Sequence, residues 1–375
     1  MPWRCVRVKD SRREFVTLAE THTVVFGDLC RRFGISRPTG YKWVQRYRQG
    51  GEAGLEDRSR RPHRVVHPVP AATEDSVVAL RRRHPAWGSR KIRKRLPDAL
   101  APLPACSTIT AILHRHHLIA PEGPGGRRDW NRFEHPVPNA LWQMDFKGPI
   151  STMDGPVHPL TVLDDHSRYN LGLQALTNRQ TLAVRQTLTG IFRHYGLPDV
   201  ILVDNGSPWG NDAEHPHTPL TVWLMHLGVG VSNSRPYHPQ TLGKDERFHR
   251  TLKQEVVNGR QWRHREHLQQ ALDTWRVEYN FQRPHEALGM DVPASRYRPS
   301  LRTFPETLPS IDYPAGVAVR RVQQAGQVCF EGRTIRISKA FRGYPVGFRP
   351  AKEEGTFEVL FRHHIIARVT LGPKE

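Results

Sequence analysis

Apolar residues near the start of the chain recur every three to four positions, which is the spacing of amphipathic helices. Gly34 interrupts the second of these runs, and Ser36 has a side chain suited to cap a third helix, with Pro38 tolerated in its first turn. The pattern therefore predicts three short helices before residue 60. Their apolar faces are Phe15, Leu18 and Ala19, then Phe26, Leu29 and Phe33, and finally Tyr41, Val44 and Tyr47.

The third predicted helix leaves a polar and basic face exposed. A helix, a glycine-containing turn and a second helix with basic residues near its start form the helix-turn-helix arrangement. We therefore expect residues 1–60 to form a DNA-binding domain, whereas the plainer alternative is a helical hairpin with a solvated basic face. The residues expected at DNA are Arg37, Thr39, Lys42 and Arg46.

A second helix-turn-helix unit is expected within residues 61–138, together with linkers. The middle one of its three predicted helices is strongly basic and places Arg90 and Lys91 among the candidates for DNA contact. Proline-rich stretches at 57–70 and 121–138 are typical of linkers. The helix signals are the apolar residues Val77, Val78 and Leu80, the start Trp87-Gly88-Ser89 before 90–96, and a cap at Ser107 followed by Ile109, Ile112 and Leu113.

From residue 139 the pattern changes to short apolar runs separated by longer helical stretches. Such an alternation predicts an α/β core over 139–300, with a mixed sheet covered by helices on both faces. The expected strands are 141–146, 160–163, 171–176, 200–203 and 229–232, and the expected helices are 179–194, 219–227, 243–257 and 264–279.

Residues 310–375 read as a separate β unit. Six short apolar runs alternate there with Gly, Pro and acidic turns, which predicts a small β-barrel. The fold class expected for the whole chain is therefore multidomain, with two all-α units, a central α/β core and a C-terminal barrel. The expected barrel strands are 316–322, 327–330, 333–337, 347–349, 356–361 and 364–370.

The charge distribution adds a partner to this picture. The 375 residues carry 56 Lys plus Arg against 36 Asp plus Glu, a net charge of +20, which points to a polyanion such as DNA. Residues 1–60 hold 13 basic and 7 acidic groups and 61–138 hold 14 and 6, whereas 139–300 hold 17 and 16. The flanks are therefore suited to hold DNA, and the centre to hold cations.

Cysteine spacing and hydropathy exclude several classes of protein. The four cysteines stand singly and form no C-x-x-C pair, so neither a structural zinc site nor a disulfide framework is expected. No apolar run approaches the ~18 residues needed to cross a bilayer. We therefore expect no membrane partner and a location in a reducing cytoplasm.

Three acids occupy positions at which active sites are often built. Asp145 lies in the first strand of the core, Asp204 ends the fourth, and Glu246 lies in the first turns of the helix that begins at 243. Carboxylates brought together repel one another, and Mg²⁺ relieves that repulsion because it prefers oxygen ligands. The same helix carries basic residues that should position phosphates, unless they form a merely solvated face. They are Lys244, Arg250 and Lys253.

Several sequence motifs around these acids are long and occur in a specific order. They are WQMDF at 142–146, LDDHSRY at 163–169, VDNGS at 203–207, HPQTLGKDERFHRTL at 238–252 and NFQRPHEAL at 280–288. With these motifs the chain resembles the retroviral-integrase-like transposases of bacterial insertion sequences. The resemblance extends to the N-terminal half through the motifs around 33–36 and 87–89, and so covers most of the chain.

The resemblance implies a ribonuclease-H-like catalytic core, two Mg²⁺ or Mn²⁺ ions, and a D-D-E triad that falls on Asp145, Asp204 and Glu246. Forty-one residues separate Asp204 from Glu246, more than is usual in this superfamily, and the polar stretch 209–219 should absorb the difference as a loop. Asp245 should point about 100° away from Glu246 and be exposed, although it is the main rival for third metal ligand. Asp164 and Asp165 should have structural roles in a turn.

The implied function is that of a transposase. It would bind the terminal inverted repeats of a mobile element, hydrolyse a phosphodiester at the element end, and use the freed 3′-hydroxyl to attack target DNA. Its partners would be double-stranded DNA and further copies of itself, in the cytoplasm of a bacterium near the nucleoid. The alternative is a non-catalytic DNA-binding protein derived from a transposase, in which the middle domain only dimerises.

Overall fold

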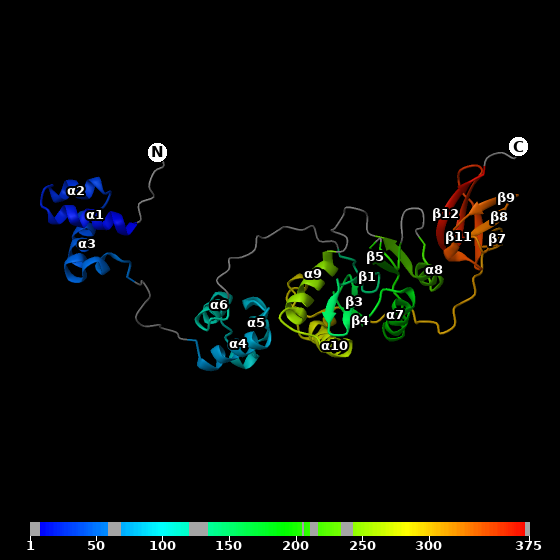
Figure 1. Ribbon diagram of the computed structural model, residues 1–375, viewed down its shortest axis with the longest axis horizontal. Helices are drawn as coiled ribbons and strands as arrows, with labels where there is room; N and C mark the ends of the chain where they lie inside the picture. Colours follow the sequence, from blue (N-terminus) through cyan, green and yellow to red (C-terminus); the bar gives the residue numbers. More distant parts are fainter. Residues whose placement is uncertain are drawn as a thin grey trace. The chain divides into compact units, whose positions relative to one another are not determined.

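The computed structural model describes residues 8–58, 69–119, 134–204, 206–210, 217–233 and 243–371. The chain divides into two compact units, Met1–Pro68 and Val69–Glu375 (Figure 1). Most of both predicted linkers, most of the expected loop at 209–219 and the first part of the 238–252 motif lie outside the described residues. No helix in the described ranges is long and apolar enough to cross a membrane.

The first unit is built from three helices and a 3₁₀ turn. Gly34, with φ 66°, turns the chain between the second and third helices, and Ser36 caps the third by accepting a hydrogen bond from the Thr39 amide. The three predicted helices are thus confirmed. They are α1 (Val8–Glu20), α2 (Phe26–Arg32) and α3 (Arg37–Gly50), followed by η1 (Gly51–Leu55).

The buried face of α3 differs from the prediction. Tyr41 is 61% exposed and stacks on the Phe26 ring, whereas Trp43 and Val44 are buried in the core. Gly40 lies at the closest point of α3 to its neighbours, where a side chain would collide with theirs. The prediction that Tyr41 faces inward is wrong because the buried face begins at a glycine, which gives no hydrophobic signal.

The second unit starts with another small helical domain, whose core surrounds the buried Trp87. A helical unit at this position was predicted correctly, but Ser107 does not cap its last helix. That helix begins one residue earlier, after the extended Ala105, so that Ser107 lies within the first turn. The elements are α4 (Ala71–Arg83), α5 (Ser89–Arg95), η2 (Asp98–Leu100) and α6 (Cys106–Arg115).

A mixed sheet forms the centre of the second unit, as predicted. Its strand order is β2-β3-β1-β5-β6, with β4 paired to β3; β1 runs antiparallel to β3 and parallel to β5. The short β2 was not predicted, because three residues are too few to show an alternating pattern. The strands are β1 (Leu141–Phe146), β2 (Ile150–Thr152), β3 (Gly155–Asp164), β4 (Asn170–Leu176), β5 (Val200–Val203) and β6 (Gly230–Asn233).

Helices cover both faces of this sheet, which also agrees with the prediction. Residues such as Leu160 and Val162 pack against α7 and α8, and Leu163 and Leu173 pack against α9 and α10. The helix expected over 243–257 changes from α to π geometry at Lys253. The elements are α7 (Thr181–Tyr195), α8 (Pro219–His226), α9 (Gly243–Leu252), η4 (Lys253–Val257), α10 (Arg265–Phe281), η5 (Glu286–Leu288) and η6 (Pro293–Ser295).

The C-terminal segment has the six predicted strands but not the predicted barrel. Four strands form a sheet in the order β12-β11-β10-β7, and β8 pairs only with β9 among the described residues. The four-residue hairpin strands fold over the larger sheet, with Phe330 stacked on Phe348, and neither sheet closes on itself. The elements are β7 (Ala318–Arg321), β8 (Gln327–Phe330), β9 (Arg333–Arg336), η7 (Lys339–Phe341), β10 (Pro345–Pro350), β11 (Thr356–Phe361) and β12 (His364–Thr370).

Candidate active site at the carboxyl ends of the central strands

Parallel pairing of β1 and β5 places two predicted acids side by side. Gln143 is the register partner of Leu202, so Asp145 and Asp204, each two residues further along, reach the same edge of the sheet. Parallel strands end at a common edge, and active sites in α/β sheets are usually found there. The structure therefore brings together the first two acids of the predicted triad.

The surroundings of Asp145 disfavour its charged form. Burial, and then the nearby carboxylates of Asp204 and Glu246, raise the pKa of Asp145 to about 6, against the opposing hydrogen bond from the Phe146 amide at 2.7 Å. His249 lies on the other side, with its Nδ1 3.8 Å from an Asp145 oxygen. A cation bound here would therefore relieve the repulsion between Asp145 and the neighbouring carboxylates.

Asp204 is held by groups that the sequence did not single out. One carboxylate oxygen accepts hydrogen bonds from the Gly206 amide, at 2.9 Å, and from the Trp209 indole N–H. Trp209 is 1% exposed and stacks on Phe146, with ring centroids 5.2 Å apart. Since Phe146 follows Asp145, this stack ties the two acid-bearing segments together. The only hint in the sequence was that an aromatic residue, Trp209, follows Asp204 by five positions.

The start of α9 presents its two adjacent acids in opposite ways. Glu246 is exposed, and its charge contributes to the raised pKa of Asp145. Asp245 is fully buried, with neither oxygen hydrogen-bonded among the described residues. Burial, followed by the charges of Asp145 and Asp165, raises its pKa well above the usual range. The prediction that Asp245 is exposed is wrong, because it shares with Phe248 the face of α9 that packs on the sheet.

Basic residues on and near α9 differ in what they contact. Lys244 forms an ion pair with the buried Asp165 and donates a hydrogen bond to its carbonyl at 3.0 Å. Burial lowers the pKa of Lys244 to about 8, so this lysine is part of the interior. Arg250 and Lys253 are exposed. Lys253 also lowers the pKa of Lys147, after the larger effect of burial, which places a second lysine near the acids.

The turn after β3 is structural, as predicted. Asp164 accepts hydrogen bonds from the amides of Asn139 and Ser167, at 2.7 and 2.8 Å. Asp165 accepts from the Gln143 side chain and the His135 amide, both at 2.8 Å. These bonds fix the chain around β1 rather than leaving carboxylate oxygens for a ligand.

The donor set at this edge fits a hard divalent cation in kind. Carboxylate oxygens are what Mg²⁺ and Mn²⁺ prefer, and the second Asp204 oxygen has no hydrogen bond within the described residues. As these residues stand, however, no three His, Cys, Asp or Glu side chains in the described ranges converge closely enough to hold a metal ion. Metal binding would therefore draw the third carboxylate inward.

The predicted DNA-binding residues of α3 differ in what they contact. Arg37 is exposed at the first turn, while the Thr39 hydroxyl is paired with Ser36 at 2.9 Å. Lys42 and Arg46 lie over the ring of Trp43, at 4.8 and 5.1 Å from its centroid. These cation–π contacts hold two of the three cations, Lys42 and Arg46, in place.

The two α5 candidates differ in exposure, since Lys91 is half-buried and Arg90 is exposed. Burial lowers the pKa of Lys91 to about 8. Arg90 lies 4.0 Å from Glu286 of η5. Whether either residue touches DNA stays a prediction.

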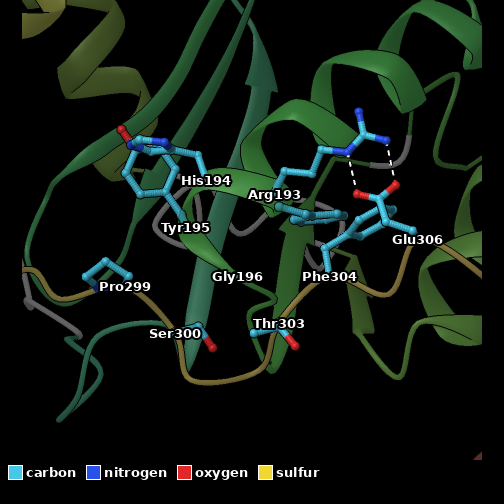
Figure 2. A pocket seen from close by; sticks show the side chains of 10 residues that line it. Arg193, His194, Tyr195, Gly196, Pro299, Ser300, Thr303, Phe304 and Glu306 are labelled. Carbon is cyan, nitrogen blue, oxygen red and sulfur yellow. Dashed lines mark hydrogen bonds and ion pairs between the residues drawn. The ribbon is translucent and has the colours of Figure 1, made fainter.

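One shallow cavity, of about 420 Å³, lies at the C-terminal end of α7 (Figure 2). Its rim includes the ion pair of Arg193 with Glu306, whose contacts are 2.8 and 2.6 Å. Phe304 packs on Phe192, so the segment joining the core to the C-terminal sheets is bound along α7. None of the predicted site residues lines this cavity.

Family models match nearly every part of the chain. Integrase core domain models match residues 135–239 and 227–293, a helix-turn-helix domain matches 12–63 and a homeodomain-like domain matches 39–113. The C-terminal domain of IS481-family transposases matches 317–374. The chain thus carries an integrase core domain, helix-turn-helix domains before it, and a C-terminal segment similar to that of IS481-family transposases. The ribonuclease-H-like core and the helix-turn-helix domains predicted from the sequence are thereby confirmed.

Two relatives of this chain come from insertion elements. It is 26% identical over 158 residues to a 31.7 kDa protein of IS407 from Burkholderia multivorans, covering 42% of this chain and 55% of that protein. It is 23% identical over 263 residues to a 39.2 kDa protein of IS476 from Xanthomonas euvesicatoria, covering 67% and 71%. The chain thus spans about half the length of the first of these relatives.

Among solved structures, the catalytic core domain of HTLV-2 integrase in complex with magnesium is similar to 44% of this chain. The match covers 99% of that chain, with 14% identity and a TM-score of 0.33.

Proposed function

We propose that this transposase binds the ends of a mobile element and catalyses metal-dependent cleavage and transfer of DNA strands. The observation that carries the proposal is that the parallel register of β1 and β5 brings Asp145 and Asp204 to the same edge of the sheet, where the charge of Glu246 also disfavours ionisation of Asp145. Acids arranged to repel one another cost stability, and such sites are usually functional.

Asp145, Asp204 and Glu246 would hold one or two Mg²⁺ or Mn²⁺ ions. When bound, these cations stabilise charge on the attacking and leaving oxygens of an in-line phosphoryl displacement. Trp209 would keep one Asp204 oxygen turned away, leaving the other for the metal. Lys147 and Lys253, which lie near each other, would hold the phosphate being attacked.

The reaction has two displacements at phosphorus. In the first, a water oxygen bonds to phosphorus as the bond to the 3′-oxygen breaks, and a free 3′-hydroxyl results. In the second, that hydroxyl attacks a phosphodiester of target DNA and a target 3′-oxygen leaves. Both steps require the same carboxylates, so loss of any one should stop both.

DNA binding would be the work of the basic flanks. Arg37, at the first turn of α3, is the residue best placed to reach a base edge, and Lys42 and Arg46 would contact the backbone. We further propose that copies of the chain assemble on DNA, because two element ends must be processed together.

A second candidate is a DNA-binding protein without catalytic activity. It is favoured by the absence of three converging ligands in the described residues. In that case the acids would be remnants, and the middle domain would serve only assembly.

Strand cleavage measured on labelled DNA carrying the flanks of the protein's own gene separates the two candidates. Cleavage should require Mg²⁺ or Mn²⁺, fail in EDTA, and be abolished by Asp145→Asn, Asp204→Asn or Glu246→Gln. Asp154→Asn, in the exposed turn between β2 and β3, is the matched control. Retained cleavage in Glu246→Gln with loss in Asp245→Asn would make Asp245 the third ligand. Binding without cleavage in any metal would establish the non-catalytic candidate.

A further inference from the structure

We propose that α5 is a docking surface that fixes the second helical domain to the catalytic core, and that α6 is the helix of this domain that reads DNA. The assignment of α6 as a DNA-reading helix rests on the proposed function. The docking itself rests on contacts between α4, α5 and the C-terminal end of α10.

Opposite charges meet across this contact. Five of the seven residues of α5 are basic, and two of them, Arg90 and Lys94, lie next to acids that follow α10. Lys94 Nζ lies 3.1 Å from Asp291 Oδ1, and Arg90 lies 4.0 Å from Glu286. His84, at the end of α4, is 2.8 Å from a third acid, Glu278, and is itself buried. A basic helix that faced only DNA would not need such partners.

Arg95 completes the end of α10. Its Nε donates to the Gln282 carbonyl at 2.6 Å, and its Nη2 donates to the Phe281 carbonyl at 3.2 Å. The last carbonyls of a helix have no partner within the helix, and a cation there also opposes the negative end of the helix dipole. Arg95 therefore supplies what α10 lacks, in a geometry that lysine could not reproduce.

The interface is partly closed to solvent. His84 stacks on Trp87 with ring centroids 3.9 Å apart, and both line a cavity of about 360 Å³ together with Gln282 from the core. Lys91 of α5 is half-buried, and the charges of Arg283, Glu255 and Glu286 in the core all act on it.

Docking through α5 leaves α6 available. Its apolar side, including Ile109 and Ile112, is buried in the helical domain. Ser107, Ala111 and His114, at positions i, i+4 and i+7, are exposed on the other side. In a helix-turn-helix the second helix enters the major groove and the first lies across it. With α5 bound to α10, the offset between the bases read by α6 and the acids of the core would be fixed.

The core side of the contact belongs to the catalytic scaffold. Tyr279, in the last turn of α10, packs edge-to-face on Phe248 of α9, with ring centroids 4.9 Å apart. Since α9 carries Glu246, the helix on which the helical domain docks, α10, packs directly against the helix that carries the third acid. The packing of α10 on α9 would thus fix the position of the DNA-reading helix relative to the active site.

Charge reversal in the full-length chain tests the docking. Lys94→Glu and Asp291→Lys should each increase amide exchange in peptides from 84–96 and 278–291 several-fold, because each places like charges together. The double variant should return exchange to near the wild-type rate. Unchanged exchange in both single variants, or no recovery in the double variant, would overturn the docking.

DNA binding by the same variants tests the assignment of the helices. If α5 touched DNA, Asp291→Lys would leave affinity unchanged or raise it; docking instead predicts weaker binding to element ends, restored in the double variant. Ser107→Ala with His114→Ala should weaken binding to element ends by roughly 5- to 150-fold and to random DNA far less. Equal loss on both DNAs would overturn the reading role of α6. If the chain selects no DNA at all, the proposed function fails, whereas the exchange result still decides the docking.

Discussion

Replacing Asp145 by asparagine should stabilise the metal-free protein above pH 6 while it abolishes strand cleavage. Burial and the neighbouring acids raise the pKa of Asp145 from 3.8 to about 6, so the folded state binds this proton more tightly than the unfolded state does. The folded protein therefore loses stability as the pH rises from 3.8 through 6, and the full penalty remains at higher pH. Asparagine cannot ionise and does not incur this penalty.

The size of the gain follows from the shift. About two pKa units at 1.36 kcal/mol each give about 3 kcal/mol, and we expect about 2 because the Asp145 side chain is 25% exposed to screening solvent. For a unit as large as Val69–Glu375 that corresponds to a rise of roughly 3 °C in the unfolding midpoint. The carboxamide oxygen can still accept the hydrogen bond from the Phe146 amide, so little packing should be lost.

Calorimetry of the full-length chain in EDTA, at pH 4 and at pH 8, measures this gain. Wild type and Asp145→Asn should unfold at similar temperatures at pH 4, and the variant should unfold later at pH 8. Mg²⁺ at pH 8 should raise the midpoint of the wild type but hardly that of the variant, because a ligand stabilises only the state that binds it. Asp154→Asn, at an exposed carboxylate, is the control and should change neither. A variant that is no more stable than wild type at pH 8 would refute the electrostatic reasoning.

Four further outcomes are expected. Trp209→Phe keeps the aromatic stack but removes the indole N–H from Asp204, so Mn²⁺ affinity measured by electron paramagnetic resonance should change by roughly 10-fold or more; an unchanged affinity would deny Trp209 its positioning role. Glu255→Ala leaves the buried Arg283 without its partner and should cost about 3–5 kcal/mol, seen as faster amide exchange in α10. Gly40→Ala puts a methyl group 2.8 Å from the Cys30 sulfur and should lower the stability of the first unit by about 1–3 kcal/mol, whereas Gly50→Ala, which meets open space, should not. Arg37→Ala should cost about 1–3 kcal/mol on element ends and much less on random DNA in a gel shift; equal losses would assign it to the backbone.

Local patterns determined most of the elements of this protein. The strands Leu141–Phe146, Val200–Val203 and Thr356–Phe361 agree with their apolar runs residue for residue. Such agreement is expected where a short run of large apolar residues lies between strong turn signals. The turns set the two ends of the strand, and the apolar side chains are buried in any fold that the chain adopts. The order of the long motifs also identified the family, and with it the fold of the core.

The tertiary structure decided what those elements do with their polar groups. Whether Asp245 or Glu246 is buried depends on which face of α9 packs on the sheet, and a rule that charged residues are exposed gave the wrong answer. Trp209 acquired its role only when the segment after β5 brought its indole to Asp204. The partner of the basic helix α5 lies about 190 residues further along the chain. Local spacing cannot show such contacts, since they depend on burial and charge compensation between segments that meet only in the folded chain.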